Sequence, residues 1–406
     1  MRDALAVEPG FMASAGDQLV AAADGMFDRI RLKLRNVLTP SQPVTEAKAF
    51  AGRRKVLSRL IDAIEDQRLH VVLYGSRGMG KTSLLHVLTQ RARDARYQVV
   101  YGSCGVGTTF SDLFRGLCAE IPLRFHQNAR GSGSEASRET IASLLPPGDL
   151  SAREIADMLG GLIGTRVLMI VDEFDRSGDG DFRERIADLI KTLSDRAVRV
   201  QLIIAGVGTN LAELIEHIPS IQRNIIGLQI PLMSDDEVRE LLEIAHNQAG
   251  LTFSDEAAQL IVLVARGWPY VATLLAHHAA LSAIRAKRVE VGVADAREAI
   301  HQAAEEVAGR LSRETLREVA QARTKAGAHC LSAAAKAHIA LGGEFTPDDL
   351  ESGGDCSAAL DTLAREALLL NAKEDRFGRS YEFRDVTVPL HLWLSSVVAT
   401  LPEAET

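Results

Sequence analysis

The chain has 406 residues, of which 46% are hydrophobic and 25% are charged, which is ordinary for a globular protein of two or three domains. Its formal net charge of −8 and pI near 5.8 argue against a surface coated with basic side chains for nucleic acid. The sequence contains no run of about 18 apolar residues and no secretion signal. We therefore expect a cytoplasmic protein without membrane contact.

The four cysteines, Cys104, Cys118, Cys330 and Cys356, have no C-x-x-C spacing and no set of adjacent histidines. This pattern suggests neither a zinc site nor a disulfide framework. We expect all four to be reduced and to pack as small buried hydrophobic side chains.

Residues 17–38 carry apolar side chains at helical intervals and predict a helix. We interpret its polar face mainly as a solvated surface, with contact to a partner, a membrane or nucleic acid as alternatives. That face holds Arg29, Arg31, Lys33 and Arg35. Prolines at positions 40 and 43 then end the helix. Residues 1–47 are thus predicted to form an N-terminal helical extension and a linker.

Residues 48–231 alternate between helices and near-continuous apolar strands. Strands are expected at 70–74, 98–101, 166–171, 200–205 and 225–230, and helices at 53–65, 83–93, 110–119, 153–162 and 181–194. Such a pattern predicts an α/β core whose parallel sheet is sandwiched by helices, with ligands at the carboxyl ends of the strands. Residues 127–149 are rich in Gly, Ser and Pro and predict a mobile insertion.

Residues 75–82, Gly-Ser-Arg-Gly-Met-Gly-Lys-Thr, fit the phosphate-binding pattern G-x-x-x-x-G-K-[ST] between a strand and a helix. Backbone N–H groups of such a loop surround a β-phosphate, the lysine reaches the β and γ oxygens, and the threonine hydroxyl ligates Mg²⁺. Because no guanine-reading segment is present, we predict binding of ATP or ADP with Mg²⁺. The predicted contacts are Gly75, Ser76, Arg77, Gly78, Met79, Gly80, Lys81, Thr82 and Ser83.

An acidic pair follows the strand expected at 166–171. Asp172 is predicted to hold Mg²⁺ together with Thr82, and Glu173 to polarise the water that attacks the γ-phosphate. Asp175 is the weaker alternative for either role. The pair therefore predicts a Mg²⁺-dependent ATPase rather than a protein that only binds ATP.

Two further candidates follow from position alone. Asn210, after the strand at 200–205, is placed to orient the attacking water, with Thr209 as runner-up and a helix N-cap as the competing interpretation. Arg223 precedes the strand at 225–230 and is a candidate to stabilise a γ-phosphate bound by a neighbouring subunit. An exposed or internally ion-paired arginine is the alternative there.

The remainder of the chain is mostly helical. Helices expected at 235–249, 254–265 and 270–287 form a lid within residues 232–310, and Ser234 and Ser254 are plausible N-caps. Residues 311–406 show helices, including one at 357–370, followed by two short strands around a glycine-containing turn. That order predicts a winged-helix-like domain.

The order of these parts resembles an AAA+ ATPase, and more closely the branch that holds origin-recognition initiator ATPases and STAND signalling NTPases. Residues 75–82 and 171–173 match its two nucleotide motifs. The resemblance implies that Gly52 and Arg53 belong to the segment that covers the adenine, that Asn210 is the sensor-1 residue, and that Arg223 is an arginine finger.

One position departs from the initiators. Their sensor-2 arginine is replaced here by Gly267-Trp268-Pro269-Tyr270. A Gly-x-Pro at this point is similar to the STAND pattern, which implies that Pro269 lies against the base and that the lid reports the nucleotide state. A proline that only begins a helix is the alternative. The resemblance thus favours a slow switch over fast hydrolysis.

Two functions remain open from the sequence. The first is a nucleotide-controlled switch whose winged helix docks on protein, either a partner or another copy of the chain. The second is an initiator-type or transposition-type ATPase that acts on DNA. Residues 311–406 contain ten Lys and Arg against fifteen Asp and Glu, and this acidic balance favours the first function.

Overall fold

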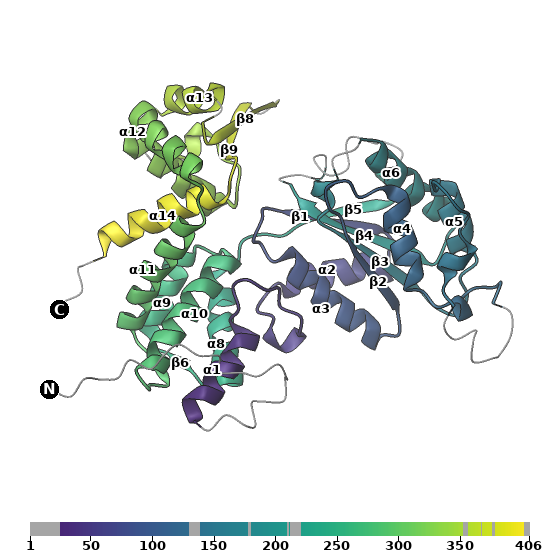
Figure 1. Ribbon diagram of the computed structural model, residues 1–406, viewed down its shortest axis with the longest axis horizontal. Helices are drawn as coiled ribbons and strands as arrows, with labels where there is room; N and C mark the ends of the chain where they lie inside the picture. The colour runs from purple at the N-terminus through teal and green to yellow at the C-terminus, as the bar shows by residue number, and fades with distance from the viewer. Residues whose placement is uncertain are drawn as a thin grey trace.

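The computed structural model describes residues 25–129, 139–177, 180–208, 211, 221–351, 356–366, 368–375 and 378–401. Three parts are visible in Figure 1: an α/β core, a helical lid on which the N-terminal helix lies, and a small C-terminal part beside the lid. None of the described helices has the length and apolarity needed to cross a lipid bilayer. This arrangement confirms the predicted fold class.

The core sheet has five parallel strands in the order β2-β3-β4-β1-β5. Their bounds are β1 His70–Gly75, β2 Gln98–Ser103, β3 Val167–Asp172, β4 Val200–Val207 and β5 Ile225–Gln229. All five strands were predicted within a few residues. Because β4 separates β1 from β3, the phosphate loop after β1 and the acidic pair after β3 lie on either side of the end of β4.

Side chains of each strand point alternately to two different hydrophobic cores. In β1, Val71 and Leu73 pack in one core whereas Val72 packs in the other. The first core is covered by α2 and α3 and continues into the lid, and the second is covered by α4, α5 and α6. A strand buried on both faces needs an unbroken apolar run, which is what the sequence contains.

The core helices are bounded as the periodicity predicted, to within two residues. They are α2 Arg54–Glu65, α3 Lys81–Asp94, α4 Phe110–Ala119, α5 Ala152–Gly160 and α6 Gly180–Asp195. The predicted mobile insertion at 127–149 is wrong for its described C-terminal half. Residues Ile141–Leu144 form a short 3-10 helix there, and Ile141 is fully buried in the second core.

The N-terminal helix α1 (Met26–Val37) packs on lid helices α8 and α10. It buries Ile30, Leu34 and Val37, whereas Arg29 and Lys33 are exposed, as the helical spacing predicts. The first part of the predicted helix, residues 17–24, lies outside the described residues.

The lid contains α8 Asp235–Ala249, α9 Asp255–Ala265, α10 Pro269–Arg285 and α11 Val293–Gly309, with the short parallel strands β6 Thr252–Phe253 and β7 Glu290–Val291. Both predicted N-caps are confirmed. The Ser234 hydroxyl accepts the N–H of Glu237, and the Ser254 hydroxyl accepts the N–H of Ala257. These caps satisfy N–H groups that the first helical turn leaves without partners.

The C-terminal part is a winged helix. It contains α12 Arg313–Leu341, a 3-10 turn at Pro347–Asp349, α13 Ser357–Arg365, the antiparallel strands β8 Leu370–Asp375 and β9 Gly378–Phe383, and α14 Thr387–Thr400. The helix predicted at 357–370 ends earlier, because Leu370 begins β8. Residues 384–400 were not assigned a separate element from the sequence, yet α14 packs on both α11 and α12.

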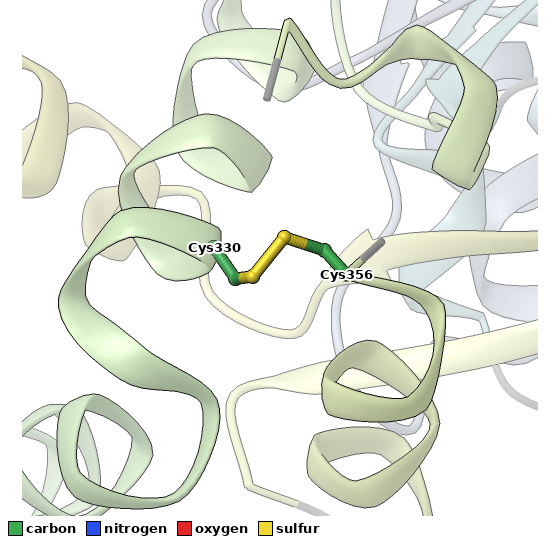
Figure 2. Close-up of a disulfide and its surroundings, with 2 residues drawn as sticks. All are labelled: Cys330 and Cys356. Atoms are coloured by element: carbon green, nitrogen blue, oxygen red, sulfur yellow. A yellow bond between two sulfur atoms is a disulfide. The ribbon is translucent and has the colours of Figure 1, made fainter. Parts of the chain in front are cut away.

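The expectation of four unpaired cysteines is wrong. Cys330 and Cys356 form a disulfide that joins α12 to the first residue before α13 (Figure 2). The two residues are 26 positions apart, one within α12 and the other just before α13, so no short spacing in the sequence indicates that they pair. Cys104 and Cys118 are free and buried, as expected.

We expect reduction of this disulfide to destabilise the winged helix. Closing a loop of 26 residues removes enough chain entropy from the unfolded state to stabilise the domain by about 3 kcal/mol. Urea unfolding with and without dithiothreitol measures the loss. A Cys330→Ser/Cys356→Ser variant should unfold like the reduced wild type and ignore the reductant. Identical wild-type curves in both conditions would contradict the assignment.

The core also contains a neutral histidine whose titration should affect stability. The side chain of His70 is 2% exposed, and its Nδ1 accepts the N–H of Leu202 at 2.9 Å. Burial lowers the pKa of His70 from 6.5 to about 4. Between pH 6.5 and 4, His70 is therefore protonated in the unfolded chain but neutral in the folded core. Its contribution to the free energy of unfolding is complete above pH 6.5 and is lost as the pH falls.

A shift of this size predicts that His70 alone costs about 2 kcal/mol of stability between pH 7 and pH 5. His70→Asn keeps an acceptor for Leu202 but does not titrate, so its unfolding free energy should depend less on pH. Urea titrations at the two pH values make the comparison. His301→Asn, on an exposed position of α11, serves as the control and should keep the wild-type dependence.

Candidate functional site

The phosphate loop connects β1 to α3 and is built on glycines with positive φ. Gly78 has φ +82° and Gly80 has φ +85°, a region that side chains with a Cβ rarely adopt. Helix α3 begins at Lys81. The first N–H groups of α3 therefore face the loop, and the helix dipole adds partial positive charge there.

Lys81 folds back over its own loop. Its Nζ donates to the carbonyl oxygens of Gly75 at 2.7 Å and Ser76 at 2.9 Å. Burial lowers the pKa of Lys81 to about 8, although Asp175 and Asp172 act in the opposite direction. A nearby anion would restore the full charge of this ammonium group, which is what a polyphosphate supplies.

Thr82 and Asp172 meet although they lie 90 residues apart. The Thr82 hydroxyl donates to Asp172 Oδ2 at 2.8 Å, and the N–H of Glu173 donates to Asp172 Oδ1 at 2.8 Å. Hydroxyl and carboxylate oxygens are the donor set that Mg²⁺ prefers in proteins. The residues present therefore fit a magnesium ion, which Thr82 and Asp172 would hold.

Glu173 stands directly after β3 in a left-handed conformation, with φ 53°. Its carboxylate accepts hydrogen bonds from the Ser103 hydroxyl at 3.3 Å and from Arg176 Nη1 at 2.9 Å. The neighbouring Asp175 accepts the N–H of Val207 at 2.7 Å. One oxygen of Asp175 is thus engaged by the backbone of β4, and one oxygen of Glu173 is engaged by Ser103 and Arg176, so both acids stay candidates for activating water.

These residues surround a cavity of about 510 Å³, which is the size range of small-molecule sites. Lys81, Thr82, Asp172 and Glu173 belong to its lining. The lining also includes apolar side chains, among them Phe50, Met79, Met233, Leu241 and Pro269. A cavity with both kinds of lining suits a nucleotide, which has charged phosphates and a largely apolar base.

Sequence reasoning missed one wall of this cavity. Residues 39–44, the linker after α1, line it together with Val37. The segment is fixed to α3, because the Val44 N–H donates to the Ser83 hydroxyl at 3.1 Å and the Ala47 N–H to Gln90 at 3.0 Å. The two prolines that end α1 were the only signal, and they indicate a break rather than a binding wall.

Gly52 and Arg53 connect the core to the lid. The Arg53 guanidinium donates to the carbonyls of Pro231 and Met79, the latter at 3.3 Å, and its N–H donates to Glu237 at 2.5 Å. Burial lowers the pKa of Arg53 to about 10, so it stays charged at neutral pH. Arg53 lines the cavity, whereas Gly52 is not part of its lining and donates its N–H to the Glu240 carboxylate.

Pro269 is the first residue of α10 and lines the cavity, and its contact with a base stays a prediction. The preceding Gly267 has φ +77°, and a Cβ there would lie 2.3 Å from the carbonyl oxygen of Met233. The N–H of Met233 donates to the carbonyl of Gly267 at 2.8 Å. Glycine is therefore required to bring this turn against the end of the core.

The last two candidates, Arg223 and Asn210, have different outcomes. Arg223 is 78% exposed and forms a 3.8 Å ion pair with Asp195, so it does not reach the site of its own chain. Asn210, with its alternative Thr209, lies outside the described residues. Gly206 and Val207, at the end of β4, do line the cavity.

Residues 49–204 match the family profile described as AAA ATPase domain. No curated protein matches the chain in sequence. A Walker-type ATPase of Pyrococcus abyssi is 16% identical, with TM-score 0.52, 87% of this chain covered and 98% of that chain. Cdc6p of Pyrobaculum aerophilum is 15% identical, with TM-score 0.47 and coverages of 90% and 98%.

The Orc1 protein of Aeropyrum pernix, solved in complex with DNA, is 16% identical, with TM-score 0.41 and coverages of 91% and 98%. At such identities the likeness concerns the fold alone. The family match agrees with the two nucleotide motifs and with the cavity between them. We conclude that this chain carries an AAA ATPase domain in residues 49–204.

Proposed function

We propose that this protein binds ATP with Mg²⁺, hydrolyses it slowly, and acts as a molecular switch whose lid and winged helix transmit the nucleotide state to a protein partner. The observation that carries the proposal is the convergence of Lys81, Thr82, Asp172 and Glu173 in the lining of a nucleotide-sized cavity. Lid residues line that cavity, and the winged helix contacts Ser76 and Trp268, which are next in sequence to lining residues.

The site residues divide the chemistry between them. Lys81 and the N–H groups of the loop would neutralise phosphate charge, and Thr82 with Asp172 would hold a magnesium ion that supplies further positive charge to the phosphates. Glu173 accepts a hydrogen bond from the water that attacks the γ-phosphate. We assign the cavity wall at Met79 and Pro269 to the adenine base.

Slow hydrolysis is supported by the contacts of Glu173. Its ion pair with Arg176 and its bond with Ser103 both engage Oε2, so a water that uses this oxygen has to compete with both donors. Arg223 is exposed and is free to approach a neighbouring subunit only after it leaves Asp195. We retain it as a candidate finger that acts between copies of the chain.

Transmission to the winged helix is supported by direct contacts. The Ser76 hydroxyl of the phosphate loop donates to the carbonyl of Gly342 at the end of α12. The indole N–H of Trp268, next to Pro269, donates to the carbonyl of Ile339 at 2.7 Å. Nucleotide in the cavity therefore acts on residues that touch the winged helix on two sides.

A protein partner is favoured over DNA by the charges of the winged helix. Lys373 lies 3.2 Å from Glu382, and Arg379 lies 2.9 Å from Asp361. Lys373 lies in β8 and Arg379 in β9, the two strands of the wing, and Arg379 also contacts α13, the helix that would read DNA. DNA binding needs phosphate contacts at these places. Because acidic neighbours already neutralise them, the DNA-binding alternative has no support from the described wing.

We expect Lys81→Ala to weaken ATP binding by about 10- to 100-fold, because a buried charged donor to the phosphates is lost. Calorimetry or fluorescent ATP measures the affinity. In the wild type, ATP should also change hydrogen exchange at residues 339–343, and the variant should show no such change. Lys191→Ala on the exposed face of α6 is the matched control. Equal affinities for all three proteins would overturn the assignment of the site.

We expect Glu173→Gln to bind MgATP as the wild type does and to lose turnover by about 100-fold or more, because the amide cannot accept a proton from water. Phosphate release measures turnover, and the binding assay confirms an intact site. Glu184→Gln, an exposed glutamate on α6, should leave both unchanged. If Glu173→Gln turns over ATP at the wild-type rate, the base is another residue.

A further inference from the structure

The carboxylate of Asp172 has one hydrogen-bond partner that neither nucleotide motif supplies. The Tyr101 hydroxyl donates to Asp172 Oδ2 at 2.5 Å. The same oxygen accepts the Thr82 hydroxyl at 2.8 Å, and the other oxygen accepts the N–H of Glu173. Three donors thus fix a carboxylate whose residue is only 4% exposed.

The fold determines where the tyrosine points. Tyr101 lies in β2, which pairs in parallel with β3 so that Ser103 stands opposite Asp172. Its side chain lies on the face of the sheet that α3 covers, among the first hydrophobic core. There its ring stacks on His86 of α3, with centroids 5.4 Å apart and an interplanar angle of 7°. The stacked ring leaves the hydroxyl directed to Asp172.

A divalent cation bound at Thr82 needs this arrangement. The threonine oxygen offers a lone pair to the cation only if its hydrogen points away, and Asp172 Oδ2 receives that hydrogen. If the carboxylate rotates, the hydrogen of Thr82 loses its acceptor and the two oxygens no longer face the cation together. A second donor on Oδ2 opposes that rotation.

We propose that Tyr101 is a positioning residue for the magnesium ion of this site: its hydroxyl holds the Asp172 carboxylate in the orientation that Thr82 and the cation need. This proposal rests on the proposed function of the cavity. It assigns Tyr101 no contact with nucleotide and no proton transfer. Its effect is therefore confined to the part of ATP affinity that depends on magnesium.

Tyr101→Phe tests the proposal, because it removes the hydroxyl and keeps the ring that stacks on His86. Fluorescent ATP is titrated in EDTA, in excess Mg²⁺, and at fixed ATP with increasing Mg²⁺. Loss of a hydrogen bond to a charged group predicts about a tenfold higher Mg²⁺ midpoint. The affinity in EDTA should stay within about twofold of the wild type, since this contact does not involve the nucleotide.

The chain offers a matched control in Tyr97, which lies just before β2 and donates to Glu65 at 2.5 Å, away from the cavity. Tyr97→Phe should leave both affinities and the Mg²⁺ midpoint unchanged. His86→Ala keeps the hydroxyl but removes the stacked ring, and it should move the midpoint in the same direction by a smaller factor.

Two results would overturn the proposal. One is a wild-type Mg²⁺ midpoint in both Tyr101→Phe and His86→Ala, and the other is an equal loss of ATP affinity with and without Mg²⁺ in Tyr101→Phe. The second result would reveal a purely structural role. Wild-type protein that binds no ATP in either buffer would instead refute the proposed function, so the two failures are distinguishable.

Discussion

The hydrogen bond between Thr82 and Asp172 is the contact on which the site depends. It joins the helix after β1 to the end of β3, and β4 lies between these two strands in the sheet. Only a parallel sheet, whose strands all end at the same edge, brings the two segments together across an intervening strand. The apolar runs that bury the sheet on both faces therefore also place the polar groups of the site.

The turn before α10, at Gly267, packs so closely beside this edge that it accepts only glycine at that position. Gly267 approaches the backbone of Met233 so closely that no other residue fits, and Pro269 then begins α10 beside the cavity. Between them, Trp268 is 1% exposed and bonds the winged helix. Three consecutive residues thus contact the start of the lid, the winged helix and the cavity.

The sequence predicted the features that depend on local pattern. Apolar runs identified the five strands, and the glycines and Lys81 identified the phosphate loop, because each of these signals lies within a few neighbouring residues. Contacts between distant segments left no such signal. Tyr101 reaches Asp172 only through strand pairing, the linker at 39–44 reaches the cavity only through α3, and Cys330 meets Cys356 only when two helices pack.

The size of the contacts limits how the proposed switch could work. A neutral hydrogen bond such as that from Ser76 to Gly342 contributes about 1 kcal/mol, which changes a two-state ratio by about fivefold. Driving such an equilibrium from one state almost wholly to the other takes about 5.5 kcal/mol of differential binding. The phosphate loop alone therefore cannot release the winged helix.

The remaining energy has to come through the lid. Trp268 contacts the winged helix at Ile339, and Trp393 of α14 donates to the carbonyl of Val264 in α9 at 2.9 Å. The buried core also continues from the lid to Ile339, Leu390 and Leu394 of the winged helix. Nucleotide that displaces α10 at Pro269 would disturb all of these contacts together, and a displacement of this kind supplies the cooperativity that a single hydrogen bond lacks.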